Sequence, residues 1–185
     1  MLRAIHKGID CAHTGVRVVA GATPPGGLND RNRISQQNST RYLKTHHVGS
    51  SFDVCSRHPY TPRGIRHPPA PNRAANDTTT TVTLYNLKVL LRIFSGKPFY
   101  LTEYGYKTRP SEFFGEFSVT PRVQASYLKS AYSYVRRYKR VKLMLWYLLH
   151  DVRHAGKPAK SGTYSGLRTI GGSRKPAWYA FKAVR

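Results

Sequence analysis

Acidic residues are scarce in this chain of 185 residues, which has 8 Asp plus Glu against 31 Lys plus Arg and a formal net charge of +23. Such an excess of positive charge favours polyanionic partners, with nucleic acid first and acidic membrane surfaces second. The basic residues, however, are spread from Arg3 to Arg185. Their densest run, from Arg136 to Lys142, has the pattern of a helix C-terminus, where cations oppose the negative end of the dipole. Charge alone therefore leaves a binding role open without assigning one.

Cysteine, long apolar runs and cofactor motifs are also scarce. Cys11 and Cys55 are the only cysteines, which excludes a disulfide framework or a clustered zinc site and predicts two buried, inert thiols. No segment approaches the roughly 18 apolar residues of a membrane span. No HExxH, phosphate-loop or GxGxxG motif is present, and His46 and His47 would face different directions on a helix, so we expect no metal or other cofactor. The amphipathic N-terminal segment predicts a helix. It contains no signal-peptide core, and the cellular compartment cannot be predicted from this sequence.

Short apolar runs alternate with amphipathic segments along the rest of the chain. The apolar runs predict strands over residues 16–21, 52–60, 98–105 and 141–151. The amphipathic segments predict helices over residues 40–48, 83–96, 118–140 and 175–185. In the third helix, Thr120 fits the N-cap and Pro121 the first turn. This alternation predicts an α/β fold with a parallel sheet.

Three of the predicted strands end in residues whose side chains can take part in catalysis or ligand binding. In a parallel sheet, functional side chains gather at the C-terminal ends of the strands. Glu103, one of only three glutamates, ends the third strand and precedes a Tyr-Gly-Tyr sequence. The strand ends together bring the following residues to one edge: His58, Tyr60, Glu103, Tyr104, Trp146 and Asp151.

Four stretches carry a resemblance to a known family: FDVCSRHPYTP, KPFYLTEYGYKT, KLMLWYLLHD and GLRTIGGSRKPAWYAFK. Their order and spacing resemble those of retaining (β/α)8-barrel glycoside hydrolases, closest to the cellulase-like and family 39-like members. The resemblance covers nearly the whole chain but only strands five to eight of the barrel. It implies that residues 1–185 form a single partial domain, the C-terminal half of a TIM barrel, that lacks the first four strand–helix units and begins after strand four.

The resemblance also implies roles by position. Glu103 takes the place of the catalytic nucleophile at the end of strand seven, and His58 and Tyr60 stand beside the sugar. Trp146 takes the place of the aromatic sugar platform. Tyr104 adds a hydrogen-bond donor, as do Tyr106 and His58, which helps to keep a nucleophilic carboxylate ionised. The acid/base glutamate of the family follows an Asn, and this sequence contains no Asn-Glu pair.

Plainer interpretations stand beside these roles. Glu103 is also typical of a capping or salt-bridging carboxylate in so basic a chain, and His58 of a histidine bonded to backbone. Trp146 and Trp178 are also typical of core residues. Among the other carboxyls, Asp151 is the best placed to approach the site after the final strand, and residues 112 and 116 lie in the loop after strand seven.

The resemblance therefore implies an O-glycosyl hydrolase that acts on β-glycosidic bonds in oligo- or polysaccharides with retention, or a truncated remnant of one. We expect weak or absent activity from this chain alone, because a retaining glycosidase needs two carboxyl groups. The alternative is a non-catalytic protein that binds nucleic acid or another polyanion, an interpretation favoured by the net charge and by the basic loop from Arg57 to Arg73. The unpaired edge strands of the sheet would also allow two chains to associate as a homodimer.

Overall fold

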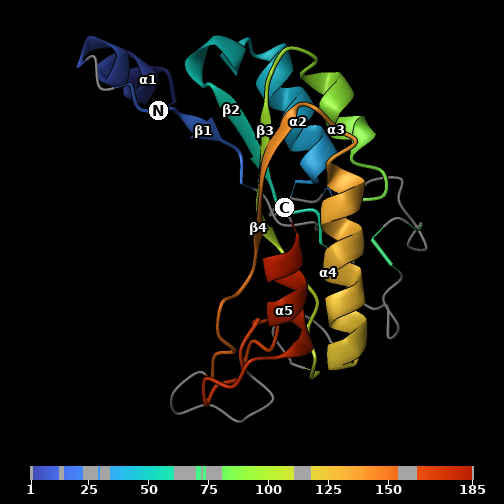
Figure 1. Ribbon diagram of the computed structural model, residues 1–185. Helices are drawn as coiled ribbons and strands as arrows, with labels where there is room; N and C mark the ends of the chain where they lie inside the picture. Colours follow the sequence, from blue (N-terminus) through green and yellow to red (C-terminus); the bar gives the residue numbers. More distant parts are fainter. Residues whose placement is uncertain are drawn as a thin grey trace.

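The computed structural model describes residues 2–12, 15–22, 29, 34–60, 70–71, 73, 81–110, 118–153 and 162–184. Its centre is a four-stranded sheet in the order β1-β2-β3-β4, in which every neighbouring pair is parallel (Figure 1). The strands are β1 (Val19–Ala20), β2 (Val54–Arg57), β3 (Phe99–Tyr104) and β4 (Val141–Trp146). The predicted parallel α/β fold is thereby confirmed.

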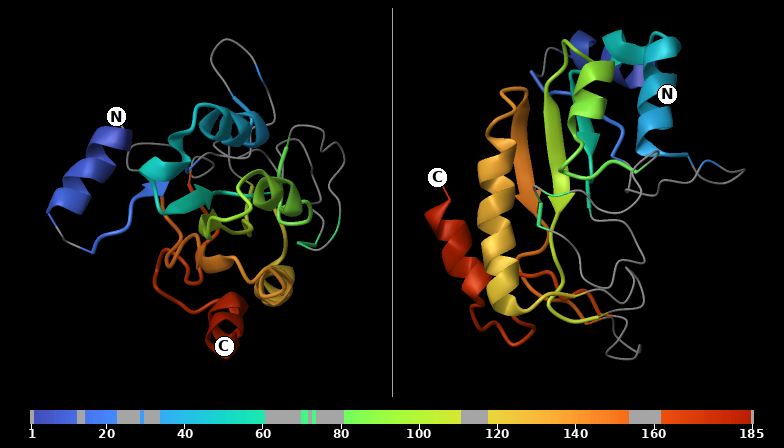
Figure 2. Two further views of the ribbon diagram at one scale, coloured as in Figure 1. Left: turned by 90° about the horizontal axis from the view of Figure 1, so that it is seen from above. Right: turned by 90° about the vertical axis from the view of Figure 1, so that its right-hand side faces the viewer.

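The helix α1 precedes the first strand, and the other helices follow strands in sequence and lie outside the sheet. The helices are α1 (Leu2–Cys11), α2 (Gln36–Thr45), the 3-10 helix η1 (Val48–Ser51), α3 (Lys88–Ile93), α4 (Pro121–Val135) and α5 (Pro176–Ala183). Seen from above, α2, α3, α4 and α5 form an arc around the outer side of the curved sheet (Figure 2). Within the described residues, no helix covers the inner side. This arrangement is part of a (β/α)8-type barrel.

Residues of the last strand alternate between the two faces, as the pleat requires. On β4, Met144 and Trp146 are each 8% exposed, whereas Leu143 and Leu145 are 36% and 45% exposed. The buried set belongs to the core that packs against the helices, where Phe99 and Leu101 of β3 are also fully buried. The inner face thus presents apolar side chains that the described part of the chain leaves uncovered.

Local side-chain hydrogen bonds cap the first turns of α2 and α4. The Thr120 hydroxyl accepts from the Val123 amide at 3.3 Å with Pro121 in the first turn, as predicted. The Ser35 hydroxyl accepts from the Asn38 amide at 3.1 Å, so α2 begins four residues earlier than predicted.

The helix predicted over residues 83–96 is shorter because its first residues form a turn. The Asn86 side chain accepts from the Thr83 amide at 2.8 Å and donates to the Thr81 carbonyl at 3.0 Å. Leu84 and Leu87 still enter the core from this turn, at 1% and 0% exposure.

The two cysteines differ in environment. Cys55 on β2 is buried, and burial raises the pKa of its thiol to about 11. Cys11 is exposed, so the prediction of two buried thiols is wrong for this residue. The reason is that α1 packs only loosely and buries none of its residues. None of the helices in the described part of the chain has both the length and the apolar composition needed to cross a bilayer.

Candidate active site

Glu103 lies at the C-terminal end of β3 with a side chain that is 36% exposed. Its Oε2 atom accepts a hydrogen bond from the Tyr60 hydroxyl at 3.2 Å. The Nδ1 atom of His58 lies 3.4 Å from the same oxygen. Both partners come from the segment that directly follows β2, so the parallel pairing of β2 with β3 brings the three residues together. The structure thus groups three of the predicted site residues around one carboxylate.

His58 is held in place by hydroxyl groups of the sheet. Its Nε2 atom lies 2.9 Å from the Thr102 hydroxyl, which in turn lies 2.5 Å from the Ser56 hydroxyl. Burial lowers the pKa of His58, and the Glu103 carboxylate opposes that shift only in part. The ring is therefore neutral at neutral pH. A neutral ring that carries its proton on Nδ1 donates to Glu103 and accepts from Thr102 through Nε2.

Tyrosine hydroxyls complete the surroundings of Glu103. Burial, together with the Glu103 charge, raises the pKa of Tyr60, so its hydroxyl stays protonated and donates. Burial and the same charge raise the pKa of Tyr147, which follows β4 at this edge of the sheet. Sequence reasoning missed Tyr147. The signal was its position one residue past Trp146, directly after the C-terminal end of β4.

Tyr104 and Trp146 lie beneath this group rather than in it. Tyr104 is 2% exposed, donates its hydroxyl to that of Tyr106 at 3.0 Å, and stacks under the Tyr60 ring with 6.1 Å between centroids. Trp146 is 8% exposed and donates its indole N–H to the Ser165 carbonyl at 2.9 Å. Both side chains belong to the buried core, and a register irregularity between Leu101 and Tyr104 precedes Tyr104 on β3. Their roles as donor and sugar platform stay predictions.

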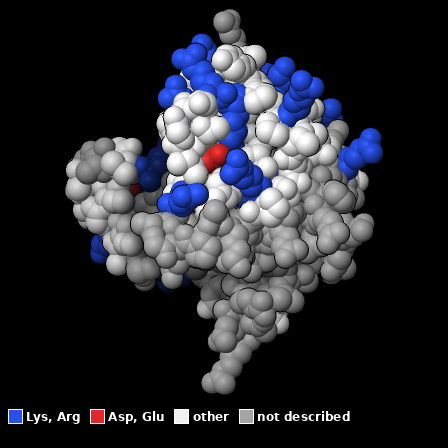
Figure 3. Space-filling view, turned by 90° about the horizontal axis from the view of Figure 1, so that it is seen from below, with Lys and Arg blue, Asp and Glu red and all other residues white. Residues whose placement is uncertain are grey.

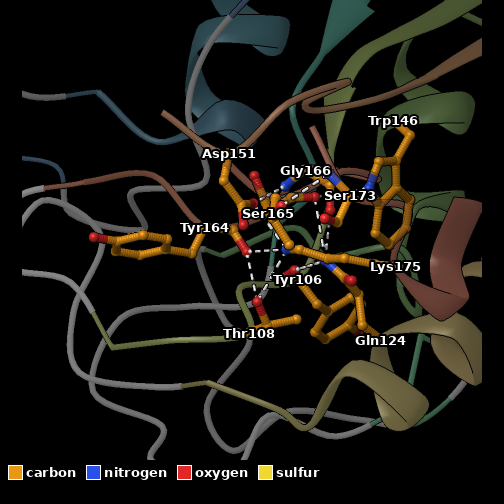
Figure 4. A network of polar contacts seen from close by, with 11 residues as sticks. Tyr106, Thr108, Gln124, Trp146, Asp151, Tyr164, Ser165, Gly166, Ser173 and Lys175 are labelled. Atoms are coloured by element: carbon orange, nitrogen blue, oxygen red, sulfur yellow. Dashed lines mark hydrogen bonds and ion pairs between the residues drawn. The ribbon is translucent and has the colours of Figure 1, made fainter. Parts of the chain in front are cut away.

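A second carboxyl group does not face Glu103 within the described part of the chain. Asp151, the best-placed candidate from the sequence, accepts through Oδ1 from Lys175 Nζ and from the Gly166 amide, each at 2.8 Å (Figure 4). Asp53 precedes β2 at the opposite edge of the sheet, where it accepts from the Val18 amide at 2.7 Å. Asp10 lies on α1 and contacts His6 Nδ1 at 2.8 Å, and the carboxyls at positions 30, 77, 112 and 116 lie outside the described residues.

Basic side chains gather around this edge of the molecule. In the view from below, which looks toward the C-terminal ends of the strands, Lys and Arg lie on several sides of an acidic residue near the centre (Figure 3). With a formal net charge of +23, the field at this edge favours negatively charged ligands.

Comparisons of the structure with solved structures identify the fold. A family 39 glycoside hydrolase from the gut symbiont Bacteroides cellulosilyticus WH2 matches 99% of this chain with a TM-score of 0.67 and 16% identity. The chain has a glycoside hydrolase-like fold. A monomeric beta-xylosidase from Caulobacter crescentus CB15 matches 97% of it with a TM-score of 0.56 and 22% identity. The chain spans 36% and 35% of the lengths of these two proteins. No family model matches the sequence, and no curated protein matches it by sequence.

Proposed function

We propose that this chain is part of a retaining glycoside hydrolase for β-glycosidic bonds in oligo- or polysaccharides, with Glu103 as its nucleophile. The observation that carries the proposal is the partly exposed Glu103 carboxylate at the C-terminal edge of the sheet, hydrogen-bonded to Tyr60 at 3.2 Å with His58 at 3.4 Å. Donors on one oxygen stabilise the charged form and leave the other oxygen available for attack. The glycoside hydrolase-like fold supports the same assignment.

In this mechanism, Glu103 attacks the anomeric carbon of the sugar and forms a covalent glycosyl ester, while the leaving oxygen departs with a proton from a second carboxyl group. Water then attacks the ester and releases the sugar with retained configuration. Tyr60 and His58 hold the carboxylate for in-line attack. Tyr147, which directly follows β4 and whose pKa is raised by burial and by the Glu103 charge, is a candidate beside Trp146 for the aromatic wall of the sugar site.

The acid has to come from outside the described residues. Retaining enzymes place their two carboxyl groups about 5–5.5 Å apart. The inner face beside β1 and β4 is open, and the matched structures are about three times as long as this chain, which covers 36% of the first of them. We place the chain as one half of a (β/α)8 barrel whose other four strand–helix units supply the acid. The half alone is expected to hydrolyse ordinary glycosides weakly or not at all.

The leaving group provides the test. A dinitrophenolate departs without protonation, so a dinitrophenyl β-glycoside requires the nucleophile but not the acid. The chain should release a burst of dinitrophenolate with such substrates and leave the matching methyl glycosides intact. Glu103→Gln should abolish the burst. A burst that survives in Glu103→Gln would contradict the assignment.

The net charge of +23 favours a second candidate, a non-catalytic polyanion-binding protein on a hydrolase scaffold. Binding through charge releases counterions, so affinity for heparin or DNA would fall steeply and linearly on a log–log plot against salt concentration. Tight, salt-sensitive binding to both polymers without any dinitrophenolate burst would favour this candidate over the hydrolase.

A further inference from the structure

A cavity of about 250 Å³ lies on the helix side of the C-terminal edge, apart from the residues around Glu103. Its walls come from the segments that follow β3 and β4, the first residue of α4 and the turn before α5. None of the residues that contact the Glu103 carboxylate lines it. The lining residues are Thr108, Arg109, Pro121, Asp151, Tyr164, Thr169, Ile170, Gly171 and Lys175.

The floor of the cavity is a buried ion pair with one oxygen left over. Lys175 Nζ donates to Asp151 Oδ1 at 2.8 Å, to the Thr108 hydroxyl at 3.0 Å and to the Tyr164 carbonyl at 3.2 Å, which uses all three of its protons (Figure 4). Oδ1 of Asp151 also accepts from the Gly166 amide. The Asp151 side chain is only 7% exposed, and its Oδ2 atom makes no hydrogen bond within the described part of the chain. This oxygen can therefore accept a hydrogen bond from a ligand in the cavity.

The rim of the cavity carries an uncompensated positive charge. The Arg109 guanidinium lies 5.6 Å from the centroid of the Tyr164 ring and is close enough to Lys175 for its charge to act on that residue. Asp151 is already paired with Lys175, and no carboxylate pairs with Arg109 among the residues that the structure describes. The cavity therefore has one acceptor and one cation free for a ligand.

The outer wall of the cavity is an ordered turn. The Thr169 amide donates to the Ser173 carbonyl at 2.9 Å, and the Ser173 amide donates to the Thr169 hydroxyl at 3.1 Å. Gly171, at the tip, has open space around the position of a Cβ atom. The cavity is therefore largely pre-formed, as small-molecule sites are, and its size suits one sugar unit rather than the larger ligands of pockets of roughly 300–1,000 Å³.

We propose that this cavity binds a uronic-acid unit of an acidic polysaccharide, with the sugar carboxylate on Arg109 and a ring hydroxyl donating to Asp151 Oδ2. A uronic acid offers an anion and hydroxyl donors on one ring. A neutral sugar in the cavity would have no anion for Arg109, and a simple anion would have no hydroxyl to donate to Asp151 Oδ2. The net charge of +23 suits such a polymer. As a statement about substrate, the inference rests on the proposed hydrolase function, whereas the binding site stands on its own geometry.

The test is a calorimetric titration of the 185-residue chain with methyl β-glucuronide, methyl β-glucoside and acetate. The glucuronide should bind at least tenfold more tightly than the glucoside, and acetate should not compete. A hydrogen bond to a charged group contributes enough free energy for about a tenfold change in affinity. Arg109→Gln should therefore weaken the binding of the glucuronide about tenfold. Gly171→Trp, which fills the cavity from open space, should abolish binding. Arg92→Gln, which removes an exposed charge on α3, is the matched control and should change nothing.

Equal affinity for glucuronide and glucoside would overturn the inference, and so would equal losses in Arg109→Gln and Arg92→Gln. Binding that is lost in Glu103→Gln but kept in Arg109→Gln would place the sugar at the carboxylate site and overturn the inference while leaving the hydrolase proposal intact. Arg109-dependent binding without a dinitrophenolate burst would support the cavity site and contradict the hydrolase proposal.

Discussion

Replacing Lys175 by methionine tests whether the buried ion pair holds the C-terminal edge together. Lys175 and Asp151 have side chains that are 6% and 7% exposed and a nitrogen–oxygen distance of 2.8 Å. Lys175→Met removes the cation but leaves the Asp151 carboxylate buried, with only the Gly166 amide as a donor on Oδ1. Breaking a buried pair in this way costs about 3–5 kcal/mol, because a charge is left without compensation. The same change also removes the bonds to Thr108 and to the Tyr164 carbonyl.

The free energy of unfolding is measured by urea titration with circular dichroism. Small domains have a total free energy of unfolding of about 5–15 kcal/mol, so the predicted loss is a large and measurable share of it. Lys182→Met, on the exposed side of the same helix α5, is the control and should change stability by less than about 0.5 kcal/mol.

A double variant separates the charge from the packing. Asp151→Asn keeps an oxygen for the Gly166 amide and removes the buried charge. If the uncompensated carboxylate is what destabilises Lys175→Met, then Asp151→Asn together with Lys175→Met should be more stable than Lys175→Met alone. A loss below about 1 kcal/mol in Lys175→Met, or no recovery in the double variant, would refute the reasoning.

Three further predictions follow from buried groups elsewhere. Thr40→Val removes the hydroxyl that accepts from the fully buried Arg57 at 3.1 Å, and should lower the free energy of unfolding by about 1–3 kcal/mol in urea titrations. Because the pKa of His58 lies below its ordinary value of 6.5, the unfolded chain binds a proton there that the folded chain does not, so stability should fall as the pH falls below about 6.5. Urea midpoints at pH 7 and pH 5 should therefore differ less in His58→Asn than in the parent chain. Iodoacetamide should modify the exposed Cys11 of the native chain and reach Cys55 only in urea, as read by peptide mass, and native modification of Cys55 would contradict its burial.

The layout of the sheet could be predicted from the sequence because each strand is a short apolar run between amphipathic segments. The group around Glu103 could also be predicted, since parallel strands bring their C-terminal ends to one edge. His58 and Tyr60 therefore meet the carboxylate although they lie more than forty positions away, with separations of 45 and 43.

Which face a residue occupies at a strand end was harder to predict. Trp146 ends β4 with a buried side chain that donates to the Ser165 carbonyl, whereas the pKa of its neighbour Tyr147 is raised by burial and by the Glu103 charge. When a strand is apolar on both faces, its sequence does not alternate between apolar and polar residues. The sequence then does not show which face is buried. In β4, Leu143 and Leu145 are as apolar as Met144, although their exposure differs severalfold, at 36% and 45% against 8%.

Pairings that depend on loops were also beyond the sequence. Asp151 was the best-placed carboxyl for the site, but its partner Lys175 lies 24 positions further along. The pair forms because the chain returns from residue 162 onward to pack against the ends of β3 and β4, with the Leu167 amide bonded to the Leu148 carbonyl at 3.0 Å. Local propensity contains no information about such a return.

The measurement that tests the central claim most directly is covalent labelling with dinitrophenyl 2-deoxy-2-fluoro-β-glycosides of several sugar types, followed by peptide mass mapping. The fluorine slows hydrolysis of the glycosyl ester, and the dinitrophenolate leaves without an acid, so the label records the nucleophile alone. We predict one sugar per chain, attached to Glu103 and absent from Glu103→Gln. A label on another residue, or no label with any of these sugars, would contradict the account.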